Sequence, residues 1–121
     1  MLRVLACLAL VLACLSDSRA EPMIDGNELH ENGKHYVGCK RKETRRNYDP
    51  SRSAHYMGYL EACYDSSLTL QLTIPAGTKL GAFCEIVYLY LENHPEKRHL
   101  PGNEVVEAAV LAAYSPLPAQ D

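Results

Sequence analysis

Cysteine thiols and histidine imidazoles are the side chains of this chain that could perform hydrolytic or metal chemistry. A cysteine nucleophile needs an adjacent base, and a metal site needs several ligands at short spacing. Cys39 and His35 are close only along the chain, and Cys84 lies on an apolar stripe that would bury it. The five histidines fall in loops and on polar faces, where we expect them at the surface: His30, His35, His55, His94 and His99. We therefore predict no catalytic residue, no metal and no cofactor.

The N-terminus predicts the compartment. A short basic start is followed by an apolar run over residues 4–15 and by the small residues of a cleavage site at Ser18-Arg19-Ala20, so residues 1–20 are predicted to be a secretory signal peptide. An alternative takes Val11-Leu12-Ala13-Cys14 as a lipobox, and a lipid on Cys14 would then anchor the protein to a membrane. Either reading predicts export.

Export also decides what the remaining cysteines can do. Cys39, Cys63 and Cys84 would face an oxidising compartment, where thiols pair. Because Cys84 is expected in the core, Cys39 and Cys63 are the predicted disulfide, which closes a loop of ~25 residues and is worth roughly 3 kcal/mol. A bridge between two molecules through Cys39 is the alternative.

Charge is distributed unevenly along the predicted mature chain of residues 21–121, which is long enough for one domain. Removal of residues 1–20 leaves ten basic and fourteen acidic residues, a net charge of −4. Seven of the cations lie in residues 34–52, whereas residues 53–121 hold three cations and eight anions. In an exported protein the basic segment suggests a protein partner or an anionic surface and not nucleic acid, with a solvated loop as the plain alternative.

Helical periodicity predicts a mainly α fold: a small single-domain bundle of about four helices with one extended segment. Residues 75–114 read as a helical hairpin, with a proline-rich elbow at residues 95–101 and Asn103 as the cap of its second helix. The buried stripe of the first helix is Leu80, Phe83, Cys84, Val87 and Leu91, and that of the second is Val106, Ala109, Val110 and Ala113.

Two helices are predicted before the hairpin. Asp25 and Glu28 form a capping box that begins a short helix limited by Gly33. The basic stretch up to Asn47 is predicted to be a loop, and Asp49-Pro50 begins a longer helix over residues 55–65. Leucines alternate with polar residues over residues 67–75, which predicts an extended connection.

Several short motifs, in order along the chain, resemble the Rap/Tai family. They are Gly26-Asn27-Glu28-Leu29, Gly58-Tyr59-Leu60 with Asp65, Ile74-Pro75 with Gly77-Thr78, Tyr90-Leu91 with His94-Pro95-Glu96, and Val105-Val106 with Ala109 and Leu111-Ala112. The cysteines that are usual in the family are absent: their places fall near Asn32, at Tyr56, near Leu72 and near Ser115. The resemblance therefore indicates a divergent member without the usual disulfides.

The resemblance implies a helical periplasmic immunity protein, often a homodimer, that blocks the cleft of a peptidoglycan amidase effector of a type VI secretion system. A periplasmic binding or structural protein of the same fold, without an effector, is the alternative. Cleft occlusion needs a rigid core and a protruding loop. We expect the partner contacts in the elbow and in the basic loop, at His94, Glu96, Lys97, Arg98, His99, Arg41 and Arg45.

Overall fold

A computed structural model describes residues 23–41 and 47–114. They form α2 (Gly26–Lys40), α3 (Pro50–Ser66), α4 (Leu68–Thr73), α5 (Leu80–Asn93), a 3-10 turn η1 (Pro95–Lys97) and α6 (Gly102–Tyr114). The mainly α single-domain fold is confirmed, and none of the described helices is long and apolar enough to cross a membrane. The predicted signal peptide, the lipidation site Cys14 and Arg45 lie outside the described residues.

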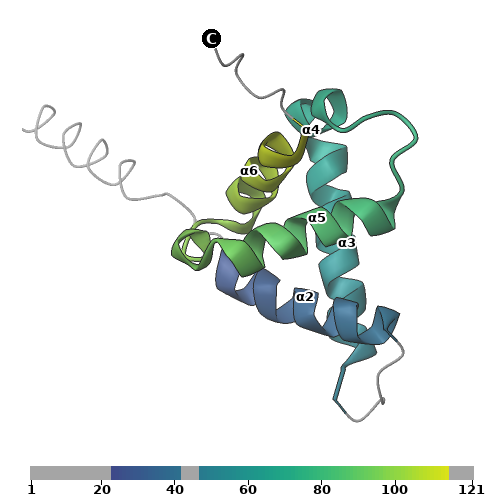
Figure 1. The fold of residues 1–121 in the computed structure, drawn as a ribbon, viewed down its shortest axis with the longest axis vertical. Coiled ribbons are helices and arrows are strands. Elements are labelled where there is room, and N and C mark those ends of the chain that lie inside the picture. The colour runs from purple at the N-terminus through teal and green to yellow at the C-terminus, as the bar shows by residue number, and fades with distance from the viewer. Residues whose placement is uncertain (1–22, 42–46, 115–121) are drawn as a thin grey trace, which may run out of the picture.

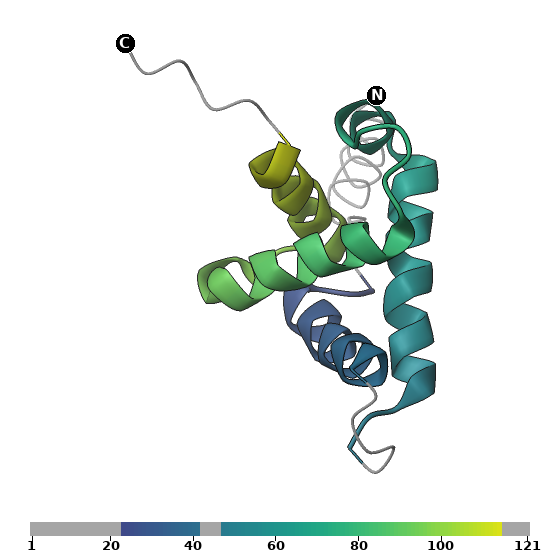
Figure 2. The ribbon, with the colours of Figure 1, turned by 45° about the vertical axis from the view of Figure 1, so that its right-hand side comes forward.

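Helix α5 lies across the other long helices and contacts α2, α3 and α6 (Figures 1 and 2). The predicted stripe of α5 is buried at Phe83, Cys84, Val87 and Leu91. The stripe of α6 is buried at Val106, Ala109 and Val110, but its last member Ala113 is exposed. Val105, which is not part of the predicted stripe, is also buried. The hairpin therefore folds as predicted, except that α6 begins at Gly102 and Asn103 lies within its first turn.

Helix α2 is longer than predicted. Asp25 caps it by accepting from the Glu28 amide at 2.9 Å, but the helix continues through Gly33 to Lys40, into the predicted basic loop. A Cβ at position 33 would lie 2.9 Å from Cδ2 of Tyr88 and 3.2 Å from Cε2 of Tyr56. Gly33 thus lies inside the helix and does not end it. The missing side chain lets the rings of α3 and α5 approach the α2 backbone.

Helix α3 begins as predicted. The Asp49 carboxylate accepts from the Ser51 amide at 2.9 Å, and Pro50 occupies the first helical position. Tyr56, Leu60 and Cys63 are buried against the core.

The predicted extended segment is instead helix α4. The Ser67 hydroxyl caps it by accepting from the Leu70 amide at 3.3 Å, and the Thr73 hydroxyl donates to the Thr69 carbonyl at 2.7 Å. A strand would place Leu68, Leu70 and Leu72 on one face, whereas here only Leu70 is buried. Local capping and the burial of Leu70 and Ile74, four residues apart, outweigh the period-two pattern.

The predicted disulfide is not formed in the structure. Cys39, Cys63 and Cys84 are free thiols, of which only Cys39 is exposed. Cys39 is close to the start of α3, because its neighbour Gly38 lies against the ring of Tyr48. Cys63 lies thirteen residues after Pro50, or about 20 Å along α3. The two thiols are therefore too far apart to be bridged.

Burial should make the three thiols react very differently. It raises the pKa of Cys84 to about 11 and also raises the pKa of Cys63, so both remain protonated near neutral pH. In the chain from residue 21 onward, a maleimide reagent is expected to label Cys39 within minutes and the other two thiols only after unfolding. Mass spectrometry before and after reduction gives the number of labelled thiols. Labelling of Cys39 that required prior reduction would contradict the free thiol.

Candidate partner-binding surface

The elbow between α5 and α6 is a hydrogen-bonded turn. Three backbone hydrogen bonds follow one another through it: Lys97 N–H to His94 O at 3.0 Å, Arg98 N–H to Pro95 O at 3.3 Å and Leu100 N–H to Lys97 O at 3.1 Å.

The backbone at the beginning of α2 is hydrogen-bonded to this elbow. Gly26 N–H donates to Leu100 O and Gly102 N–H donates to Ile24 O, both at 2.9 Å, on either side of a bridge between Asp25 and Pro101. A Cβ at Gly26 would lie 2.7 Å from Arg98 O, so only glycine permits this approach. Gly26 belongs to a short motif of the sequence, but no local pattern indicates this contact with a residue 72 positions away.

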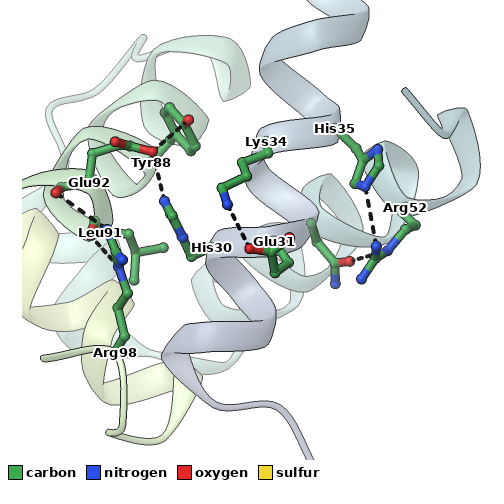
Figure 3. Close-up of polar contacts among 10 residues, drawn as sticks. His30, Glu31, Lys34, His35, Arg52, Tyr88, Leu91, Glu92 and Arg98 are labelled. Carbon is green, nitrogen blue, oxygen red and sulfur yellow. Dashed lines mark hydrogen bonds and ion pairs between the residues drawn. The ribbon is translucent and has the colours of Figure 1, made fainter. Parts of the chain in front are cut away.

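Two of the predicted partner-binding residues support the elbow itself. The Arg98 guanidinium donates from Nε to Leu91 O at 2.8 Å and from Nη2 to Glu92 O at 3.4 Å, so it caps the C-terminus of α5 (Figure 3). The His94 ring stacks on Tyr90 with 4.1 Å between centroids and donates from Nδ1 to the Tyr90 carbonyl at 2.9 Å. Glu96, Lys97 and His99 remain exposed and form the outer face of the elbow.

Beside the elbow, His30 joins α2 to α5 through a polar cluster that the sequence analysis missed. His30 is 6% exposed, so its expected place at the surface was wrong. Its Nε2–H donates to Glu92 Oε1 at 2.7 Å, and the Tyr88 hydroxyl donates to the same oxygen at 2.8 Å (Figure 3). The His30 and Tyr88 rings are stacked, with 5.8 Å between their centroids. Its position next to Leu29 on an amphipathic helix was the available signal, but only the fold shows that Glu92 faces it.

This cluster predicts a specific loss of stability in acid. The hydrogen bond from His30, followed by that from Tyr88, lowers the pKa of Glu92 below its ordinary value. A carboxylate whose pKa is lower in the folded than in the unfolded state stabilises the fold at pH values above its unfolded pKa of about 4.3. This stabilisation is lost as the pH falls through the folded-state pKa. Glu92→Gln should therefore be less stable than the wild type at pH 7, and the difference should shrink toward pH 3. Urea unfolding at each pH measures it. A difference that is constant with pH would show that the Glu92 charge has no role.

Arg41, the other described cation among the predicted contacts, lies at the far end of α2. It lines a groove of about 430 Å³ with Val37, Lys40, Glu85, Tyr88 and Leu89. Lys40 Nζ donates to Glu85 Oε1 at 2.6 Å and closes one side of the groove. Since α2 has fifteen residues, Arg41 is separated from the elbow by about 22 Å of helix. The structure therefore does not bring the two predicted contact segments together.

Comparison with known proteins adds a decisive observation. The model of the family described as Rap1a immunity proteins matches residues 25–115. The chain belongs to the Rap1a immunity protein family. The match begins at the cap of α2 and extends one residue past α6, so it includes every described helix. No curated protein and no solved structure matches the chain.

Membership of the Rap1a immunity family implies a protein that binds a type VI effector. Two candidate surfaces for this role are the outer face of the elbow and the groove at Arg41. The buried thiols of this Rap1a protein are poor nucleophiles, because burial favours their protonated form.

Proposed function

We propose that this Rap1a family member is a periplasmic immunity protein that binds and inhibits a cell-wall-degrading amidase effector of a type VI secretion system. The family match over residues 25–115 carries the proposal, because it spans the whole helical domain. The predicted signal peptide at residues 1–20 would deliver the protein to the compartment where such an effector acts.

The elbow suits occlusion of an active-site cleft. Its exposed residues Glu96, Lys97 and His99 project from a turn that Gly26 and Arg98 hold in place. Because the turn is ordered before binding, little conformational entropy would be lost when it enters a cleft. Inhibition by occlusion needs shape and charge complementarity and no reacting group on the inhibitor. Arg41 and Arg45 are proposed as secondary, steering contacts.

Deletion of the gene tests the proposal in cells. The mutant should lose survival when it is mixed with a sibling strain that delivers the amidase encoded by the neighbouring gene, and a plasmid copy should restore survival. A second copy without residues 1–20 should not restore it, since the inhibitor would stay in the cytoplasm. Equal survival of deletion and wild-type strains would reject the immunity role in favour of a periplasmic binding or structural protein.

A further inference from the structure

Helix α4 exposes leucines that a folded monomer would normally bury. Leu70 and Ile74 face the core, whereas Leu68 and Leu72, also four residues apart, are 68% and 78% exposed. The helix is thus apolar on two opposite sides, although only one side packs on the domain. Contiguous exposed apolar side chains on a soluble domain commonly indicate an interaction site.

The two leucines are held in a defined position. The Gln71 side-chain amide, between them in sequence, donates to the carbonyls of Tyr64 at 3.0 Å and Asp65 at 3.2 Å, which ties α4 to the C-terminal end of α3. The Ser67 cap fixes the start of α4. An apolar surface that is ordered before binding loses less entropy on association and can therefore serve as an anchor.

Two hollows include carboxylates: one lies next to α4, and the other lies near the end of α3 and is lined by no residue of α4. One hollow of about 350 Å³ includes Leu68, Cys63 and Glu107, and another of about 360 Å³ includes Tyr64 together with Glu61 and Asp65. Among the described residues that line them there is neither lysine nor arginine, although the exposed Lys79 lies next to two of the lining residues in sequence. An apolar ridge with an acidic border is complementary to an apolar patch bordered by cations.

We propose that the α4 surface, defined by Leu68 and Leu72 with Asp65, to which Gln71 ties α4, and Glu107, which lines a hollow with Leu68, is the apolar anchor of the complex with the effector, and that the effector presents a matching apolar patch bordered by lysine or arginine. This inference rests on the proposed function. The charged elbow contributes steering and cleft contact, whereas burial of the leucines contributes the larger share of the affinity. In protein complexes a few desolvated side chains carry most of the binding energy, and charged contacts at the border carry less.

A second copy of this chain fits the same surface poorly. In a symmetric dimer each patch faces the same patch on its partner, so Asp65 and Glu107 would approach carboxylates of the other copy. Like charges across an interface oppose association, whereas a cationic border on the effector favours it.

The test measures binding to the amidase encoded by the neighbouring gene. Leu68→Gln/Leu72→Gln keeps side-chain length and helix propensity but removes apolar surface, and it should weaken the complex at least tenfold. Met23→Gln, which changes an exposed apolar side chain outside the named surfaces (96% exposed), should bind as the wild type does. Circular dichroism melting of all three proteins shows whether the folds are equal.

The outcomes separate this inference from the proposed function. If the wild type does not bind the amidase at all, the proposed function fails. If the wild type binds and the α4 double variant binds equally well, only the α4 anchor is wrong. Asp65→Lys/Glu107→Lys should slow association at low salt and much less at about 0.5 M salt, since screening removes steering. Loss of self-association in the double variant, seen by sedimentation with unchanged amidase binding, would instead assign the surface to a second copy.

Discussion

Replacing Tyr56 by alanine is expected to lower the free energy of unfolding by about 3–5 kcal/mol, the largest single effect in this domain. Tyr56 is 0% exposed and stands at the centre of the core. Its ring packs 5.5 Å from the Tyr36 ring and contacts the position of Gly33, and its hydroxyl donates to Cys84 O at 2.7 Å. The substitution therefore leaves a cavity where α2, α3 and α5 meet. Urea unfolding followed by circular dichroism measures the loss.

Tyr56→Phe is the matched control. It keeps the ring and removes only the hydroxyl, so its cost should be about 0.5–1.5 kcal/mol, the usual net value of one hydrogen bond. Burial raises the pKa of the Tyr56 hydroxyl, which therefore stays protonated and able to donate across the neutral range. Equal losses for the alanine and phenylalanine variants would mean that the hydrogen bond, and not the packing of the ring, holds the three helices together.

Gly26→Ala should have the second largest effect and should damage both stability and binding. The new methyl group would meet the Arg98 backbone, with 2.7 Å to its carbonyl oxygen and 2.8 Å to its Cα. Because both atoms belong to the main chain, either the elbow or the first turn of α2 must move, and overpacking of this kind costs about 1–3 kcal/mol. Thermal unfolding measures the stability, and calorimetry with the amidase measures the affinity.

Asn27→Ala next to it is the control, since Asn27 is exposed and its replacement should change stability by no more than about 0.5 kcal/mol. A Gly26→Ala protein as stable and as active as the Asn27→Ala protein would show that the close contact between α2 and the elbow is unimportant.

The helical hairpin could be predicted from the sequence because its information is local. Phe83, Val87 and Leu91 repeat at helical spacing, and Pro95 ends the first helix as the missing amide requires. The same holds for α3, where Asp49 and Pro50 form a complete start signal. In these elements local preference and tertiary packing agree, which is why the prediction succeeds.

Elsewhere the outcome depends on partners distant in sequence. Gly33 looks like a helix breaker until the Tyr56 and Tyr88 rings are seen to occupy its free side. His30 resembles a surface residue until Glu92, sixty-two positions away, is found beside it. Arg98 is predicted to contact a partner, and the structure shows in addition that its guanidinium donates to the Leu91 carbonyl at the end of α5. No single-sequence pattern reports such pairings.

Helix α4 shows a different limit. Its alternating leucines match a strand as well as they match a short helix with two apolar sides, and a segment of six residues is too short for periodicity to decide. The structure resolves the ambiguity through Ser67, Gln71 and the burial of Leu70. It leaves Leu68 and Leu72 exposed, which is the feature that a binding partner would explain.

Titration of the purified protein into the amidase encoded by the neighbouring gene, with peptidoglycan hydrolysis as the readout, tests the central claim most directly. The immunity role predicts that hydrolysis falls linearly with added protein and stops near one equivalent, while an unrelated peptidoglycan amidase is unaffected. Undiminished hydrolysis at tenfold excess of the folded protein would contradict it.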